Sequence, residues 1–174
     1  MTAAPVIRHA VALGLAVDAD GPLAGVLLLG PSGAGKSSLA LAAIDSCPFR
    51  RSAMIADDAV IVSVAANGGL VARAPAAIRG LIEVRGFGPA PVKSIGEGGL
   101  VVAFDLGAAA ERTPDPGAWD LIADARPLPL YPFLWRGAEM TAPARLRAAT
   151  ASILGGQTAE RTQDSGPIRR IEDR

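Results

Sequence analysis

The segment from Gly30 to Ser37 constrains the fold of this chain more than any other feature. It contains Gly30, Pro31, Ser32, Gly33, Ala34, Gly35, Lys36 and Ser37. This order matches the full Gly-x4-Gly-Lys-Ser/Thr pattern of a phosphate-binding loop. The apolar run at 26–29 predicts a buried strand before the loop, and the run at 38–44 predicts a helix after it. The sequence therefore predicts a strand, loop and helix unit that binds nucleotide phosphates.

Each residue type in the loop suits a polyphosphate ligand. Glycine lets the backbone turn tightly and bring its N–H groups close to phosphate oxygens. Lys36 adds a positive charge for the outer phosphates, and the Ser37 hydroxyl is suited to a magnesium ion. A glycine-rich turn that matches by accident is the alternative, and the flanking strand and helix argue against it.

Length and composition limit the domain organisation and the partners. The chain has 174 residues, which suits a single domain, predicted over residues 1–156. Residues 157–174 are polar and mixed in charge, so we expect a flexible tail. Basic and acidic residues balance at 17 each and aromatic residues make up 4%, so we expect no nucleic acid partner.

The apolar runs and the single cysteine indicate a location. Gly, Asp or Pro interrupts every apolar run before the roughly 20 residues that a membrane span needs, so we expect no membrane association. Cys47 has no cysteine to pair with, which fits a reducing compartment and a packing role. The cytoplasm is the expected location.

Turn signals predict a chain rich in strands. A turn at 18–22 separates an early strand from the strand before the loop, and Asn67-Gly68-Gly69 predicts a hairpin. A short helix is expected within 76–82, a buried strand at 100–106, short strands near 121–122 and 128–130, and a final helix over 142–154.

Acidic residues are needed beside a phosphate loop, to support magnesium and to accept a proton. Asp57 and Asp58 follow a short apolar strand and are the leading candidates, with Asp124 as a rival. A polar strand end is the alternative interpretation of the pair. His9 fits either a site near the phosphates or a strand residue, and Glu83 with Arg85 fits either a ligand pair or a cross-strand ion pair.

These segments together resemble the catalytic domain of HPr kinase/phosphorylase. The resemblance rests on His9 in a leading strand, on the phosphate loop and on the segment Ala56-Asp57-Asp58. It also rests on Ala74-Pro75 and on the run from Leu81 to Gly88, which is similar to the family's Ile-Arg-Gly-Leu-Gly signature. The order and combination of these segments are far more specific than the loop alone.

The resemblance implies a fold and a reaction. The fold is an α/β phosphate-loop kinase domain related to phosphoenolpyruvate carboxykinase, with a sheet-rich core and flanking helices. The reaction uses ATP with Mg²⁺ to phosphorylate a serine of the phosphocarrier protein HPr, which regulates the phosphotransferase system. In reverse, inorganic phosphate removes that group and yields pyrophosphate.

The resemblance also implies residue roles. Asp57 takes the serine proton, with His9 close by, and Arg112 falls where the family has a catalytic arginine. Magnesium is supported by Ser37, Asp58 and Glu83. Lys36 and the loop amides hold the phosphates.

The chain also departs from the family pattern. Few residues precede His9, so we expect a truncated form of the alphaproteobacterial kind without the family's N-terminal domain. The segment 131–137 replaces a basic Gly-Arg-Asn stretch, and its apolar part, Tyr131 to Trp135, fits either the core or an interface. The family assembles as a hexamer, so the resemblance implies a homo-oligomer. Two alternative functions stay open: a small-metabolite kinase, and a nucleotide-sensing regulator without phosphate transfer.

Overall fold

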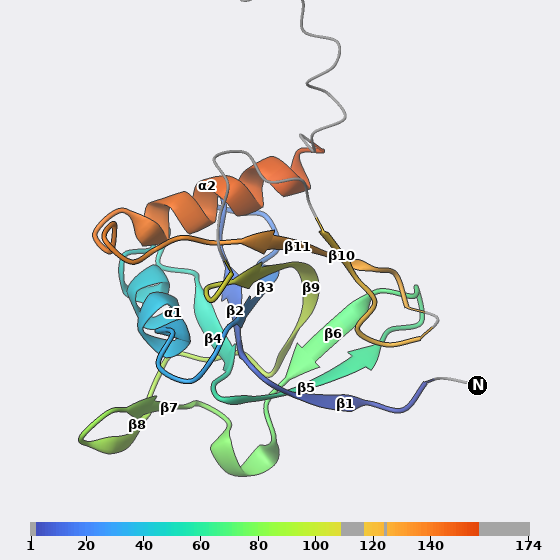
Figure 1. The fold of residues 1–174 in the computed structure, drawn as a ribbon, viewed down its shortest axis with the longest axis horizontal. Helices are drawn as coiled ribbons and strands as arrows, with labels where there is room; N and C mark the ends of the chain where they lie inside the picture. The colour runs from blue at the N-terminus through green and yellow to red at the C-terminus, as the bar shows by residue number, and fades with distance from the viewer. Residues whose placement is uncertain (1–2, 109–116, 124, 157–174) are drawn as a thin grey trace, which may run out of the picture.

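A computed structural model describes residues 3–108, 117–123 and 125–156. Its architecture is a curved mixed β-sheet with two helices packed on one face (Figure 1). The elements are β1 (Val6–His9), β2 (Val11–Leu15), β3 (Ala24–Leu29), α1 (Lys36–Asp45), β4 (Ala53–Ala56), β5 (Ala59–Val64), β6 (Leu70–Arg73), a 3₁₀ turn (Ala76–Ile78), β7 (Leu81–Val84), β8 (Gly88–Pro91), β9 (Glu97–Asp105), β10 (Gly117–Trp119), β11 (Leu128–Pro132) and α2 (Ala142–Leu154).

The strands follow the order β1-β5-β6-β9-β3-β2-β4, and β11 adds to β9 with β10 beside it. Strand β9 lies in the middle of this order. Its first residues pair antiparallel with β6, and its later residues pair parallel with β3. The pairing of β9 with β11 is also parallel, whereas β2 runs antiparallel to both β3 and β4. The predicted sheet-rich α/β fold is confirmed.

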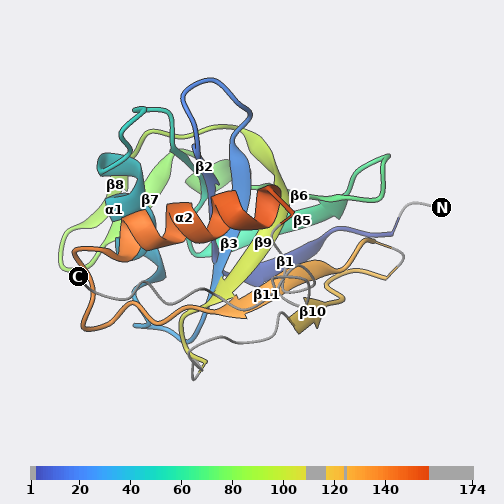
Figure 2. The ribbon, with the colours of Figure 1, turned by 90° about the horizontal axis from the view of Figure 1, so that it is seen from above.

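Strand β2 is buried on both faces, because it lies between two hydrophobic clusters. Val11 and Leu13 face the cluster that includes α1 and α2, whereas Ala12, and Ala10 just before the strand, belong to the cluster on the other side. Successive residues of a strand point to opposite faces, so a strand buried on both faces has a nearly continuous apolar sequence. In Figure 2, α2 crosses over β2, β3 and β9, where it covers the first cluster.

Several predicted elements are confirmed. The hairpin at Asn67–Gly69 joins β5 to β6, and the antiparallel pair β2–β3 surrounds the predicted turn at 18–22. The final helix spans Ala142–Leu154 as expected, and β11 contains 128–130. Among the described residues, no helix has the length and hydropathy needed to cross a membrane.

Two predictions about local structure were wrong. The expected helix at 76–82 is only a 3₁₀ turn over Ala76–Ile78, because Gly80 takes a positive φ of 75° and the chain then enters β7. The expected strand at Leu121 and Ile122 is irregular, although both side chains are buried. Their apolar character therefore reflected burial and not strand pairing.

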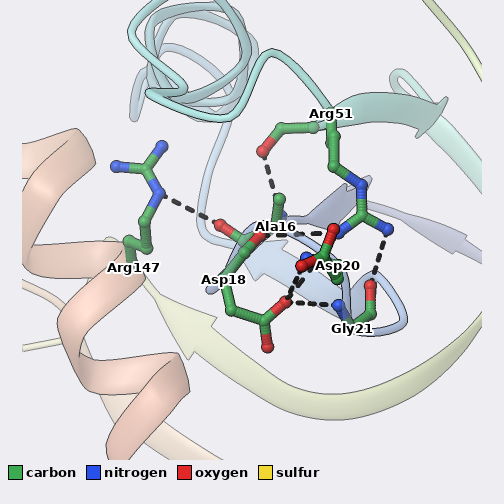
Figure 3. Close-up of polar contacts among 7 residues, drawn as sticks. Ala16, Asp18, Asp20, Gly21, Arg51 and Arg147 are labelled. Carbon is green, nitrogen blue, oxygen red and sulfur yellow. Dashed lines mark hydrogen bonds and ion pairs between the residues drawn. The ribbon is translucent and has the colours of Figure 1, made fainter.

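A hydrogen bond connects the turn between β2 and β3 to the second helix, α2. Arg147 of α2 donates hydrogen bonds to the carbonyls of Ala16 (3.1 Å) and Ala43 (3.3 Å). On the other side of the turn, Arg51 donates to Gly21 and lies 3.8 Å from a carboxylate oxygen of Asp18 (Figure 3). The turn, α1 and α2 are thereby connected by one half-buried guanidinium.

Replacing Arg147 with Met is expected to lower the free energy of unfolding by about 1 to 3 kcal/mol, because two carbonyls lose their donor. Urea unfolding followed by circular dichroism measures this change. Arg145→Met on the same helix is the control: Arg145 is exposed and lies 5.4 Å from the centre of the Phe133 ring. A contact of this kind contributes about 0.5 to 1 kcal/mol. Equal losses of unfolding free energy in the two variants would contradict the expectation that the Arg147 hydrogen bonds stabilise this turn.

Candidate active site

The phosphate loop lies between the end of β3 and the start of α1. Gly30, Gly33 and Gly35 have positive φ angles of 134°, 78° and 90°, which side chains with a Cβ rarely adopt. The Ala34 amide donates to the Pro31 carbonyl at 3.1 Å and closes a turn inside the loop. Helix α1 begins at Lys36, so its N-terminal end favours anions at the loop.

Lys36 is buried, with 6% of its surface exposed. Its ammonium donates to the carbonyls of Gly30 (2.9 Å) and Pro31 (3.2 Å), and it lies 3.4 Å from Nε2 of His9. These carbonyls solvate the charge at the base of the loop. Lys36 is thus held next to the glycine-rich turn, where the outer phosphates of a nucleotide would lie.

Asp57 follows β4 and connects the phosphate loop with β7. Its Oδ1 accepts a hydrogen bond from the Ser37 hydroxyl at 2.7 Å, and its Oδ2 accepts one from the Glu83 amide at 2.9 Å. Only 4% of Asp57 is exposed. Both carboxylate oxygens therefore have a donor, and the serine of the loop lies directly beside an acid.

Asp58 points elsewhere, because its backbone is in the left-handed region with a φ of 63°. Aspartate tolerates this conformation better than most residues. The Asp58 side chain is 63% exposed, and its Oδ1 lies 2.9 Å from Nδ1 of His9. The two adjacent acids therefore have different partners: Asp57 contacts the loop serine, and Asp58 contacts the histidine.

His9 connects Asp58 to Lys36 through its two ring nitrogens. A lysine ammonium can only donate, so Nε2 of His9 must be the acceptor in the contact with Lys36. The proton of a neutral imidazole then resides on Nδ1, which donates to Asp58. This arrangement forms a polar chain from the phosphate loop to an exposed carboxylate.

Most of these groups border one pocket of about 320 Å³. Its lining is mostly polar, with a cationic side from the loop and an acidic side from the strand ends. The lining residues are His9, Val11, Ser32, Gly33, Gly35, Lys36, Ser37, Ser38, Asp57, Asp58, Glu83 and Arg85. A pocket of this kind accommodates phosphates and leaves an acid accessible to a second substrate.

The oxygen donors at this pocket fit magnesium. Ser37, Asp57, Asp58 and Glu83 offer hydroxyl and carboxylate oxygens, which are the ligands that Mg²⁺ prefers. Within residues 3–108, 117–123 and 125–156, no three His, Cys, Asp or Glu side chains are grouped to hold a metal by themselves. Magnesium in nucleotide sites is bound by one or two protein groups together with substrate phosphates, so the donor set is compatible with it.

The sequence analysis singled out the segment 131–137 but gave two of its residues no role at the loop. Trp135 donates from Nε1 to the Ala34 carbonyl at 2.9 Å, and Arg136 donates to the Gly33 carbonyl at 2.6 Å. In the segment 131–137, Phe133 is buried in the core and Leu134 is 58% exposed. No local pattern marks Trp135 or Arg136, because their partners lie 101 and 103 positions away in the chain.

Some predicted residues cannot be placed. Arg112, Asp124 and the tail at 157–174 lie outside the described residues. The remaining predicted site residues, from His9 to Glu83, meet around the phosphate loop. No ion pair between Glu83 and Arg85 is found in the described part of the chain, and both residues border the pocket.

Comparison with known proteins identifies similar sequences. Residues 8–98 match the profile of the HPr Serine kinase C-terminal domain. HPr kinase/phosphorylase of Caldicellulosiruptor bescii is 45% identical over 71 residues, which is 41% of this chain and 22% of that protein. The enzyme of the same name from Alkaliphilus metalliredigens is 41% identical over 83 residues, covering 47% of this chain and 26% of the relative. The matches thus span about a quarter or less of these relatives.

A solved structure has the same fold. The Hpr(Ser) kinase/phosphatase from Coxiella burnetii superposes with a TM-score of 0.67, over 92% of this chain and 99% of that one, at 18% sequence identity. This likeness concerns the fold, whereas the profile match over residues 8–98 covers the loop, the acid pair and Glu83. The chain belongs to the family of the HPr serine kinase C-terminal domain.

Proposed function

We propose that this chain is an ATP-dependent protein serine kinase that acts on an HPr-like phosphocarrier and also catalyses the reverse phosphorolysis. The observation that carries the proposal is a single pocket with a phosphate loop on one side and an accessible carboxylate–imidazole pair on the other. The names of its relatives support HPr as the substrate. We propose residues 1–156 as the catalytic domain and the cytoplasm as its location.

The phosphate loop binds the donor. Lys36 and the loop amides hold the outer phosphates, and the positive end of α1 favours their charge. Ser37 and Asp57 would hold magnesium, and Glu83, whose backbone amide donates to Asp57, offers a further carboxylate at the same pocket. Magnesium held there would neutralise charge on the nucleotide phosphates during transfer.

Asp58 and His9 handle the serine proton. The serine hydroxyl gives its proton to Asp58 while its oxygen bonds to the γ-phosphorus, and the bond between that phosphorus and ADP breaks. In reverse, an oxygen of inorganic phosphate attacks the phosphoserine phosphorus, and the bond from that phosphorus to the serine oxygen breaks. The serine oxygen takes a proton from protonated Asp58, and pyrophosphate leaves. His9 orients Asp58 through its Nδ1–H.

This division of roles reverses the one expected from the family resemblance, in which Asp57 takes the proton and Asp58 supports the metal. Two contacts favour the reversal. Asp57 is bonded to the loop serine, which is the usual place of the metal-supporting acid in phosphate-loop enzymes. Asp58 is exposed and can approach a substrate hydroxyl, whereas Asp57 is nearly covered.

A test of the function is incubation of the protein with MgATP and the HPr-like carrier of the same organism. We expect one phosphoserine on the carrier by mass spectrometry, and its removal with release of pyrophosphate when phosphate is added. Lys36→Met is the control and should abolish both activities. Intact MgATP binding without transfer to the carrier would instead favour a regulator, and phosphorylation of a small molecule without carrier would favour a metabolite kinase.

A homo-oligomer also remains part of the proposal, on the basis of the family resemblance. Sedimentation velocity measures the mass of the particle in solution. We expect an assembly larger than the 17.6 kDa chain, and a monomer at the concentrations used for activity would contradict it.

A further inference from the structure

The segment that follows β11 lies against the phosphate loop and holds two of its carbonyls. The Trp135 indole N–H donates to the Ala34 carbonyl at 2.9 Å, and the Arg136 guanidinium donates to the Gly33 carbonyl at 2.6 Å. Neither residue lines the pocket. These contacts therefore reach the loop from outside the space in which the ligand would bind.

Peptide geometry links these outer contacts to the inner surface of the loop. In a trans peptide unit the C=O and the N–H point in opposite directions. Because the Ala34 carbonyl accepts a hydrogen bond from the Trp135 indole, the Gly35 N–H of the same peptide unit points away from the indole. Gly35 borders the pocket, so this amide is available to a phosphate oxygen.

The neighbouring peptide unit is held at both ends. Arg136 binds the carbonyl of Gly33, and the amide of Ala34 in that unit donates to Pro31. Gly33 and Gly35 flank these two units and would otherwise leave the backbone free to rotate. The two side chains thus restrict the part of the loop where glycine makes it most flexible.

The indole ring also fits against the backbone of Gly35. A Cβ at Gly35 would lie 2.0 Å from Cζ2 of Trp135, so the ring occupies the space that any side chain would need. Trp135 is itself held in place: it packs against the core cluster, its carbonyl accepts from Ala138, and the Phe133 amide donates to Asp105. A fixed ring therefore supports the last turn of the loop before α1.

We propose that Trp135 and Arg136 are positioning residues that keep the phosphate loop in its anion-binding conformation. The inference rests on the proposed function in one respect, namely that the loop binds nucleotide. Without these contacts, part of the binding free energy is spent on ordering the loop, so affinity for the nucleotide falls. The chemistry on the bound nucleotide is affected less, because neither residue touches the pocket.

The test uses Trp135→Phe and Arg136→Gln with MgADP as the probe. We expect the Kd for MgADP, measured by titration calorimetry, and the KM for ATP to rise by about three- to tenfold in each variant, as loss of one hydrogen bond predicts. We expect kcat to change less than KM. Loss of stability alone would lower the active fraction, and hence kcat, without a change in KM.

Trp119→Phe is the matched control, since Trp119 is the other of the chain's two tryptophans and lies in β10 away from the pocket. Its MgADP affinity should equal that of the wild type. In this variant Trp135 is the only fluorophore of its kind, and MgADP should change its emission. Wild-type affinity for MgADP in both Trp135→Phe and Arg136→Gln would overturn the inference. Absence of MgADP and MgATP binding in the wild type would instead refute the proposed function.

Discussion

The Asp58→Asn variant is expected to lose about 10²- to 10⁴-fold in kcat, which is the usual contribution of a positioned acid or base. The amide keeps the size of the side chain but cannot take the serine proton. Binding of MgATP should remain close to wild type, because the phosphate loop and the contact between Ser37 and Asp57 are unchanged. Initial rates of carrier phosphorylation and calorimetric binding of MgATP measure both quantities.

The Asp57→Asn variant provides the comparison, and we expect a different result. Its amide interacts less favourably with the Ser37 hydroxyl and with a cation, so the magnesium concentration for half-maximal rate should rise. Asp45→Asn is a control for loss of charge alone, since Asp45 is exposed at the end of α1 and does not line the pocket. The opposite result would be a large loss of kcat in Asp57→Asn at an unchanged magnesium requirement, with nearly full kcat in Asp58→Asn. It would show that Asp57, and not Asp58, accepts the serine proton.

The Gly35→Ala variant is expected to lose about 2 to 5 kcal/mol in its free energy of unfolding, from left-handed backbone strain together with overpacking. The φ of Gly35 is 90°, and an added Cβ would lie 2.0 Å from the Trp135 ring. Neither the ring nor the loop can move freely, because the indole is hydrogen-bonded to Ala34. Urea unfolding at fixed temperature measures the loss.

Gly33→Ala separates strain from overlap in the same loop. Gly33 also has a positive φ, of 78°, but an added Cβ would have no atom within 4 Å. We expect a loss of only about 1 to 2 kcal/mol from the backbone conformation. In a double-mutant cycle, Gly35→Ala should cost less in the Trp135→Ala background than in the wild type, since the space is then vacant. Equal losses in Gly33→Ala and Gly35→Ala would show that the ring imposes no steric limit.

The strand, loop and helix that form the phosphate-loop unit were predictable from the sequence. The spacing of glycines, Lys36 and Ser37 specifies a local conformation, and the flanking apolar runs specify a strand and a helix. The hairpin at Asn67–Gly69 follows from turn chemistry for the same reason. Leu121 and Ile122 were predicted wrongly, because a short apolar run has the same composition whether or not it pairs in a sheet.

Contacts between distant segments were not predictable from such patterns. The sequence by itself determined that a phosphate loop exists and that acids and a histidine are available to it. Only the tertiary structure decided that Asp57 contacts Ser37, that Asp58 contacts His9, and that Trp135 supports the loop. Turn and strand signals depend on neighbours within a few residues. These three contacts instead depend on the left-handed backbone at Asp58 and on strand pairing. The pairing places β11 beside β9 and β9 beside β3, so that the segment after β11 lies against the phosphate loop.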